Sequence, residues 1–75
     1  MSEAFTANVA RAVADEMARQ RRSQVAVAAA LGVSQTYVWR RLTGEVAFDV
    51  TELAAIAEFL GVPVQQFLTE SGSPA

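Results

Sequence analysis

The stretch Q-V-A-V-A-A-A-L-G-V, residues 24–33, decides the fold, and by itself it fits a strand, a secretion signal or a helix. The V-A-V-A alternation is typical of a strand. Ser23, however, favours the start of a helix as its N-cap, and residues 24–31 contain four alanines, the strongest helix formers. Gly32 can adopt the left-handed conformation that ends a helix. We therefore predict a short helix over residues 24–31, followed by a turn.

A secretion signal or a membrane span does not fit residues 24–33. A signal peptide carries basic residues directly ahead of its apolar stretch, whereas twenty-three residues with scattered acids precede this one. A membrane-spanning helix needs about 20 apolar residues, and the chain turns polar after Val33. The stretch is therefore expected to belong to the fold of a cytoplasmic protein that has no membrane partner.

A second helix is expected directly after this turn. Ser34 is again a good N-cap, the sequence Q-T-Y-V-W-R-R-L-T, residues 35–43, continues as a helix, and Gly44 ends it. Two short helices joined by a glycine-containing turn form a helix-turn-helix layout. Ala28 is expected to let the two helices cross closely. Their angle is expected to be fixed by one apolar set: Val27, Leu31, Val33, Val38 and Leu42.

The rest of the chain predicts three more helices and no strand. Apolar residues that recur every four positions predict a helix over about residues 3–20. Asp49 and Glu52 form a D-x-x-E capping pair that starts a helix over about residues 50–60, and Pro63 starts a last short helix. The sequence thus predicts an all-α, five-helix domain over residues 1–69 and a disordered tail over residues 70–75. The core-facing residues of these three helices are expected to be Phe5, Val9, Val13, Met17, Leu53, Ile56, Ala57, Leu60, Phe67 and Leu68.

The composition excludes several classes of function. The chain of 75 residues contains neither cysteine nor histidine, so disulfides, thiolate or imidazole metal sites and the usual nucleophilic triads are absent. No two carboxylates stand in an evident acid–base arrangement. We expect no enzyme activity, no metal, no cofactor and no small-molecule substrate.

The charges are distributed unevenly along the chain. The net charge is −2, which by itself disfavours a nucleic-acid partner. All six basic residues are arginines at or before Arg41, alongside three acids, whereas five acids and no base follow from Leu42 onward. This asymmetry is consistent with one surface for an anionic partner and another that avoids it.

The chain contains a set of short segments in a particular order and spacing: S-Q at 23–24, V-A at 27–28, L-G-V-S-Q at 31–35, Val38, L-T-G at 42–44, I-A at 56–57 and L-G-V at 60–62. In this, the chain resembles the phage-repressor class of helix-turn-helix DNA-binding domains, which includes lambdoid repressors, Cro-type proteins and xenobiotic-response-element regulators. The resemblance covers residues 5–69. It implies a five-helix fold whose third helix enters the major groove of DNA.

The resemblance also assigns the DNA contacts. Base edges are expected to be read by Gln35, Thr36 and Arg40, and a helical wheel independently points Thr36 and Arg40 away from the core. Arg40 can bind O6 and N7 of guanine, and Gln35 can bind N6 and N7 of adenine. The DNA backbone is expected to be held by Gln24, Ser34, Tyr37, Arg41 and Thr43. Helix capping is the competing role for Gln24 and Ser34. Trp39 is expected to pack against residues 44–48 rather than to touch DNA.

The chain departs from its relatives at three places. Many relatives pair an arginine with a glutamate where this chain has Met17 and Leu42, so an apolar contact is expected there. Arg41 replaces a buried apolar residue, and its head group is expected to reach a phosphate or a nearby acid. The outer side of the helix over residues 24–31 has no charge, because it consists of Val25, Ala26, Ala29 and Ala30.

The function expected from these observations is that of a sequence-specific regulator of transcription that binds double-stranded DNA. A phage or prophage-type repressor that acts by promoter occlusion is the preferred form. Two alternatives stay open: an antitoxin or accessory subunit that binds a protein as well as DNA, and an interaction module that has lost DNA binding. The chain is expected to act as a monomer or as a homodimer, formed in solution or only on DNA, with contacts through Val62, Pro63, Val64 and Phe67.

Overall fold

The computed structural model describes residues 3–68 of the chain, and all regular elements within them are helices. The elements are α1 (Glu3–Gln20), α2 (Gln24–Leu31), α3 (Gln35–Leu42), α4 (Val50–Leu60) and the short 3₁₀ helix η1 (Val64–Phe67). The all-α prediction is confirmed. The expected fifth α-helix is instead a 3₁₀ helix of four residues. The predicted tail over residues 70–75, like residue 69 of the predicted domain, lies outside the described residues.

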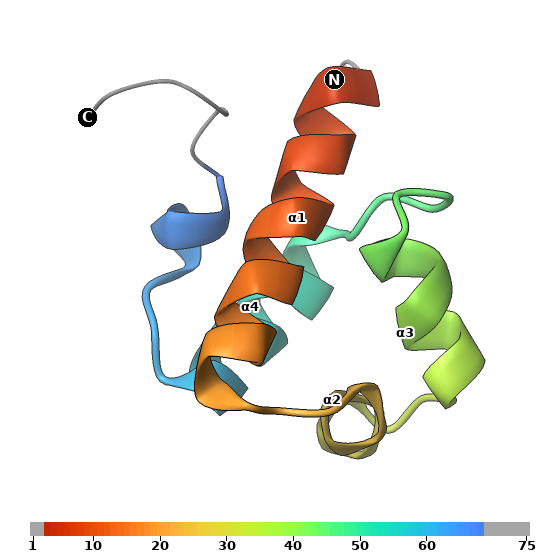
Figure 1. Ribbon diagram of the computed structural model, residues 1–75, viewed down its shortest axis with the longest axis vertical. Coiled ribbons are helices and arrows are strands. Elements are labelled where there is room, and N and C mark those ends of the chain that lie inside the picture. The colour runs from red at the N-terminus through yellow and green to blue at the C-terminus, as the bar shows by residue number, and fades with distance from the viewer. Residues whose placement is uncertain (1–2, 69–75) are drawn as a thin grey trace.

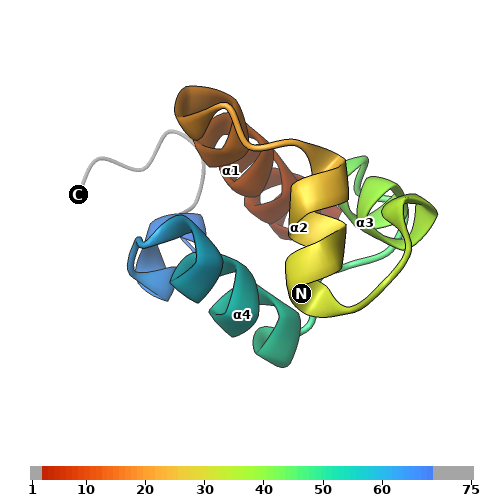
Figure 2. The same ribbon diagram turned by 90° about the horizontal axis from the view of Figure 1, so that it is seen from below.

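The four α-helices surround a single core. Figure 1 shows α1 running in front of α4, with α2 seen end-on below them and α3 on one side. Seen from below, α3 and η1 lie on opposite sides of the molecule (Figure 2). The buried side chains form one cluster, which includes Val13, Val27, Val38, Ile56 and Phe67. The periodicity of the sequence therefore predicted most of the core correctly, but Phe5 is only half-buried and Leu68 is exposed.

The stretch over residues 24–33 forms the predicted helix and turn. The Ser23 side-chain oxygen accepts a 3.0 Å hydrogen bond from the Ala26 N–H at the start of α2. Gly32 follows α2 with a φ of 73°, in the left-handed region that favours glycine. The Val33 N–H then donates to the Ala28 carbonyl over 3.0 Å, the bond typical of a Schellman motif. This turn fixes the direction in which the chain enters α3.

The end of the described chain differs from the prediction at Leu68. Phe67 is fully buried, but Leu68, expected to face inward, is 42% exposed. Leu68 is the C-cap residue that follows η1, and because successive side chains of a 3₁₀ turn point about 120° apart, Phe67 and Leu68 point in different directions. The same burial of Phe67 means that its expected role in a dimer contact is wrong, since its side chain is not at the surface.

A buried carboxylate attaches η1 to α1. Glu16 accepts hydrogen bonds from the side-chain amides of Gln20 and Gln66, each over 2.7 Å, and Arg19 lies 3.1 Å away. The amide of Gln20 also donates to the Leu60 carbonyl at the end of α4. The Gln20 hydrogen bond, with those of Gln66 and the charge of Arg19, holds the pKa of Glu16 below its ordinary value despite its burial. The carboxylate is thus charged and satisfied at neutral pH.

We predict that Phe67→Ala destabilises the domain by about 3–5 kcal/mol, since the change leaves a cavity where a fully buried ring was. That loss approaches the whole stability of a domain this small. Leu68→Ala, at the exposed neighbour, is the matched control and should cost less than about 1 kcal/mol. Urea unfolding followed by circular dichroism measures both changes, and equal losses would contradict the structural assignment of the two side chains.

Candidate nucleic-acid interface

Helix α3 has one apolar side and one polar side. Val38 is buried in the core, and Leu42 packs against it from the same side. The Ser34 side-chain oxygen caps the helix by accepting a 3.0 Å hydrogen bond from the Tyr37 N–H. The exposed residues of α3 and its C-cap are Gln35, Thr36, Trp39, Arg40 and Thr43. The helix therefore presents a mostly polar surface whose orientation is set by its apolar side.

The three residues predicted to read bases all lie on this exposed surface. Gln35 and Thr36 stand in the first turn, and their side chains form no hydrogen bond with residues 3–68. Arg40 is half-exposed and forms an ion pair with Glu45, with 3.3 Å between Nε and Oε2. An exposed ion pair of this kind is worth about 0–1 kcal/mol, so a stronger acceptor can replace Glu45 at small cost.

Among the residues predicted to hold the DNA backbone, three lie at helix ends. Gln24 is the first residue of α2, but the capping is done by Ser23 rather than by Gln24. Ser34 does cap α3. The Thr43 hydroxyl donates to the Arg40 carbonyl over 3.1 Å at the C-terminal end of α3. Gln24 therefore keeps its side chain available, while Ser34 and Thr43 already make one hydrogen bond each.

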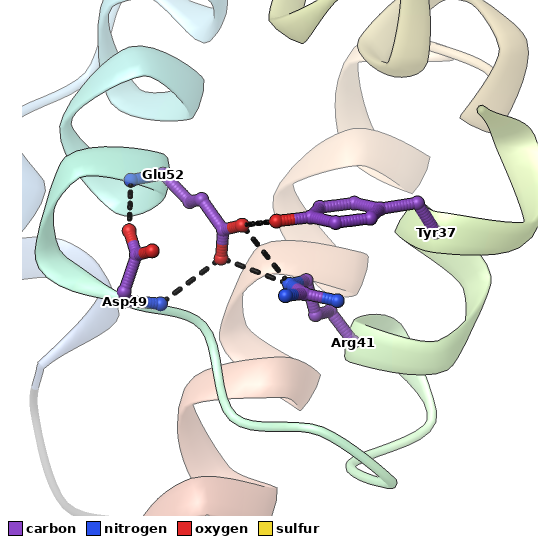
Figure 3. Close-up of polar contacts among 4 residues, drawn as sticks. All are labelled: Tyr37, Arg41, Asp49 and Glu52. Atoms are coloured by element: carbon purple, nitrogen blue, oxygen red, sulfur yellow. Dashed lines mark hydrogen bonds and ion pairs between the residues drawn. The ribbon is translucent and has the colours of Figure 1, made fainter. Parts of the chain in front are cut away.

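Tyr37 and Arg41 take part in contacts within the protein. Both side chains reach from α3 to Glu52 in the first turn of α4 (Figure 3). The Tyr37 hydroxyl donates to Glu52, and Arg41 Nε lies 2.9 Å and 3.1 Å from the two carboxylate oxygens. The guanidinium carbon of Arg41 lies 3.6 Å from the centre of the Tyr37 ring. We expected Arg41 to reach either a phosphate or a nearby acid. In the protein without DNA, its partner is the acid Glu52.

Glu52 is held in place by the start of its own helix. Its carboxylate accepts a 3.0 Å hydrogen bond from the Asp49 N–H, and the Asp49 carboxylate accepts one of 2.7 Å from the Glu52 N–H. This confirms the capping box that the D-x-x-E pattern predicted. Burial raises the pKa of Glu52, but the hydrogen bonds from Tyr37, Asp49 and Arg41 outweigh it and bring the pKa below its ordinary value. Glu52 is therefore ionised at neutral pH.

The sequence did not predict that the side chains of Glu45 and Glu52 take part in this region, and it placed Trp39 against residues 44–48. Glu45 pairs with Arg40, and Glu52 was assigned only to the start of α4. Trp39 is 49% exposed on α3, beside the predicted contacts, rather than buried against residues 44–48. Its neighbours on the helical wheel, Gln35 and Thr43, were both predicted to contact DNA and were the signal that could have placed it at the interface.

The division of charge along the sequence is not preserved in space. Arg40 and Arg41, from the basic part of the chain, pair with Glu45 and Glu52 from the acidic part. Two salt bridges thus connect the parts that the sequence suggested would lie apart. Within residues 3–68, Arg11, Arg21 and Arg22 form no ion pair, and Arg22 lies over the ring of Phe59.

The outer side of α2 is apolar, as the sequence predicted. Val25, Ala29 and Ala30 are exposed, whereas Ala26 is half-buried. No charged residue occurs in the helix. This surface therefore offers an approaching molecule neither an ion pair nor a side-chain hydrogen bond, except at Gln24.

The comparison with known families agrees with this geometry. The profile of a helix-turn-helix domain matches residues 9–67, which is most of the chain. The protein therefore belongs to this helix-turn-helix domain family, and its α2, turn and α3 form the motif by which such domains bind DNA. A search of curated proteins found no match to the chain.

None of the helices in residues 3–68 is long and apolar enough to cross a membrane. The same residues hold no group of three or more acidic side chains placed to bind a metal ion. The family match and the exposed polar side of α3 both point to the helix-turn-helix as the functional surface.

We predict that the phenol of Tyr37 titrates above its ordinary pKa of 10.0, because its hydrogen bond to Glu52, its burial and the Glu52 charge all favour the protonated form. A raised pKa means that this group stabilises the fold fully below pH 10 and that its contribution is lost as pH rises through the folded pKa. Tyr37 is the single tyrosine of the chain, so tyrosinate absorbance follows it directly. An unshifted titration in the folded protein would contradict the contact.

Proposed function

We propose that the protein is a sequence-specific regulator of transcription that places α3 in the major groove of double-stranded DNA. The observation that carries the proposal is the exposed polar surface of α3 on a helix whose opposite side is buried at Val38. A helix of this length fits the major groove, and the side chains of its first turns reach base edges. The match to a helix-turn-helix domain supports the same conclusion.

The proposed base contacts are Gln35, Thr36 and Arg40. Gln35 and Thr36 are exposed and form no side-chain hydrogen bond within the described chain, so their binding to bases breaks no existing bond. Arg40 exchanges its exposed pair with Glu45 for a guanine. Gln24 and the N–H groups at the starts of α2 and α3 contact phosphates, since helix N-termini favour anions.

The proposed mode of regulation is repression of a phage or prophage-type promoter by occlusion. Helix α2 supports this mode, because it has no acidic side chain with which to contact a polymerase. A protein of this kind represses by covering the promoter while it is bound. Its affinity comes from phosphate contacts and its specificity from α3.

The number of protein copies that bind one DNA site depends on the protein surface available for a dimer contact and on the symmetry of the DNA sequence. Phe67 is buried, so of the four residues predicted to form a dimer contact, the exposed Pro63 and the half-buried Val62 and Val64 remain for a partner. This surface is small. We propose that the chain is a monomer in solution and that two copies meet on the DNA when two half-sites are adjacent. Selection of bound sequences from random duplexes shows whether the preferred site is symmetric.

We predict that Arg40→Ala weakens binding to the selected site by about 1–3 kcal/mol and relaxes preference at one base pair. Arg11→Ala, an exposed arginine on α1, removes the same charge outside the proposed contacts and is the matched control. Binding is measured through the fluorescence of Trp39, the single tryptophan of the chain, or by anisotropy of labelled DNA.

The proposed function fails if no duplex in the random pool is bound in a salt-dependent manner, because phosphate contacts weaken as salt rises. The assignment of Arg40 alone fails if Arg40→Ala keeps both the affinity and the preferred sequence. A loss in Arg11→Ala equal to that in Arg40→Ala would indicate a general effect of charge.

A further inference from the structure

Helix α3 is held from two directions by different kinds of contact. On the side of α1 and α2 it is packed through buried apolar residues such as Val38. Toward α4, within the described chain, no Cα atom of α3 comes within 8 Å of one in α4. A groove lined by Leu31, Tyr37, Glu52 and Ala55 lies between them. On this side, long polar side chains rather than close backbone packing connect α3 to the rest of the domain.

Glu52 is the residue on which these connections converge. It accepts hydrogen bonds from Tyr37 and Arg41, which lie one helical turn apart on α3, and from the backbone of Asp49 (Figure 3). Its side chain is 12% exposed and that of Arg41 is 16% exposed, against 50% for Arg40. Because the capping box fixes Glu52 on α4, its hold on two residues of α3 fixes the rotation of that helix.

The ion pair also changes the charge that Arg41 offers to DNA. Nε of Arg41 spans both oxygens of the carboxylate, and the guanidinium stacks on the Tyr37 ring. A phosphate would have to compete with a partly buried carboxylate for this group, and partly buried pairs are screened less by salt than exposed pairs such as Arg40 and Glu45. The charge of Arg41 is thus balanced inside the protein by a partly buried acid, to which its Nε donates, whereas Arg40 is easily released from its exposed pair.

On the basis of the proposed DNA-binding function, we propose that Glu52 is a positioning residue that orients α3 for DNA through Tyr37 and Arg41 and withholds Arg41 from the phosphates. This role differs from the sequence-based assignment of Tyr37 and Arg41 to direct backbone contacts. The two assignments make opposite statements about the salt dependence of binding. They can therefore be separated by measurement.

The first test is the slope of log Kd against log salt concentration for the selected duplex. Arg41→Gln should leave this slope unchanged, whereas loss of a direct phosphate contact would reduce it by about 0.9. Glu52→Gln should make the slope steeper by up to about 0.9, since Arg41 is no longer neutralised. Adding Arg41→Gln to Glu52→Gln should restore the original slope. A reduced slope in Arg41→Gln alone overturns the withholding of Arg41.

The second test is discrimination, measured as the ratio of Kd for a scrambled duplex to Kd for the selected one. Glu52→Gln should lower this ratio severalfold, because α3 loses its connection to α4. Glu58→Gln is the matched control, since it removes the same charge from an exposed position of the same helix. Equal ratios in Glu52→Gln and Glu58→Gln overturn the positioning role. Glutamine is accepted at this position of a capping box, and thermal unfolding confirms that both variants are folded.

A third measurement separates this inference from the proposed function. In the absence of DNA, Glu52→Gln should lower the pKa of Tyr37 toward its ordinary value, whereas Glu58→Gln should not. If Tyr37 responds in this way but no duplex is bound, the proposed function is wrong and the contact itself is intact. If DNA is bound specifically and Tyr37 does not respond to Glu52→Gln, the positioning inference is wrong and the proposed function stands.

Discussion

The burial of Val38 against the core is the constraint on which the rest of the structure depends. Val38 shares its cluster with Val27 of α2, Val13 of α1 and Ile56 of α4, and all four are at most 1% exposed. A helix of eight residues is too short to be stable alone in water, so α3 exists because this contact holds it. The same contact determines which side of α3 faces outward, and thereby which residues are available to DNA.

Polar contacts refine what the apolar core establishes. Glu16 attaches η1 to α1 from the inside, and Glu52 connects α3 to α4 near the surface. Each carboxylate is ionised because hydrogen bonds and neighbouring arginines outweigh the cost of its burial. These two acids therefore act at joints between elements: Glu16 adds to the apolar packing of η1 on α1, and Glu52 connects α3 to α4, whose Cα atoms do not approach within 8 Å.

The balance of charge in the interface follows from how deeply each pair is buried. Arg40 and Glu45 are exposed and exchange partners readily, whereas Arg41 and Glu52 are mostly covered. Two adjacent arginines of α3 thus have different surroundings: Arg40 pairs with an exposed acid and Arg41 with a covered one. The net charge of −2 is consistent with DNA binding, because affinity depends on the charges near α3 and not on the sum over the whole chain.

The sequence by itself determined the helices, their caps and most of the core. Ser23, Ser34, Gly32 and the Asp49–Glu52 pair act locally, within a few residues, so their effect can be predicted without a tertiary structure. The apolar periodicity likewise predicted which side of each helix is buried. The family match confirmed the helix-turn-helix motif that these local signals indicated.

Only the tertiary structure decided the partners of long side chains and the form of the last helix. Arg41 and Glu52 are eleven positions apart, and Glu16 and Gln66 are fifty apart. No local pattern brings such residues together, because their distance depends on how the helices pack. The choice between Phe67 and Leu68 for the core was settled in the same way, since the space left by α1 and α4 admits one side chain from a 3₁₀ turn. Residues 24–33 lie at the other extreme: a cap, four alanines and one glycine were enough to make them a helix and a turn.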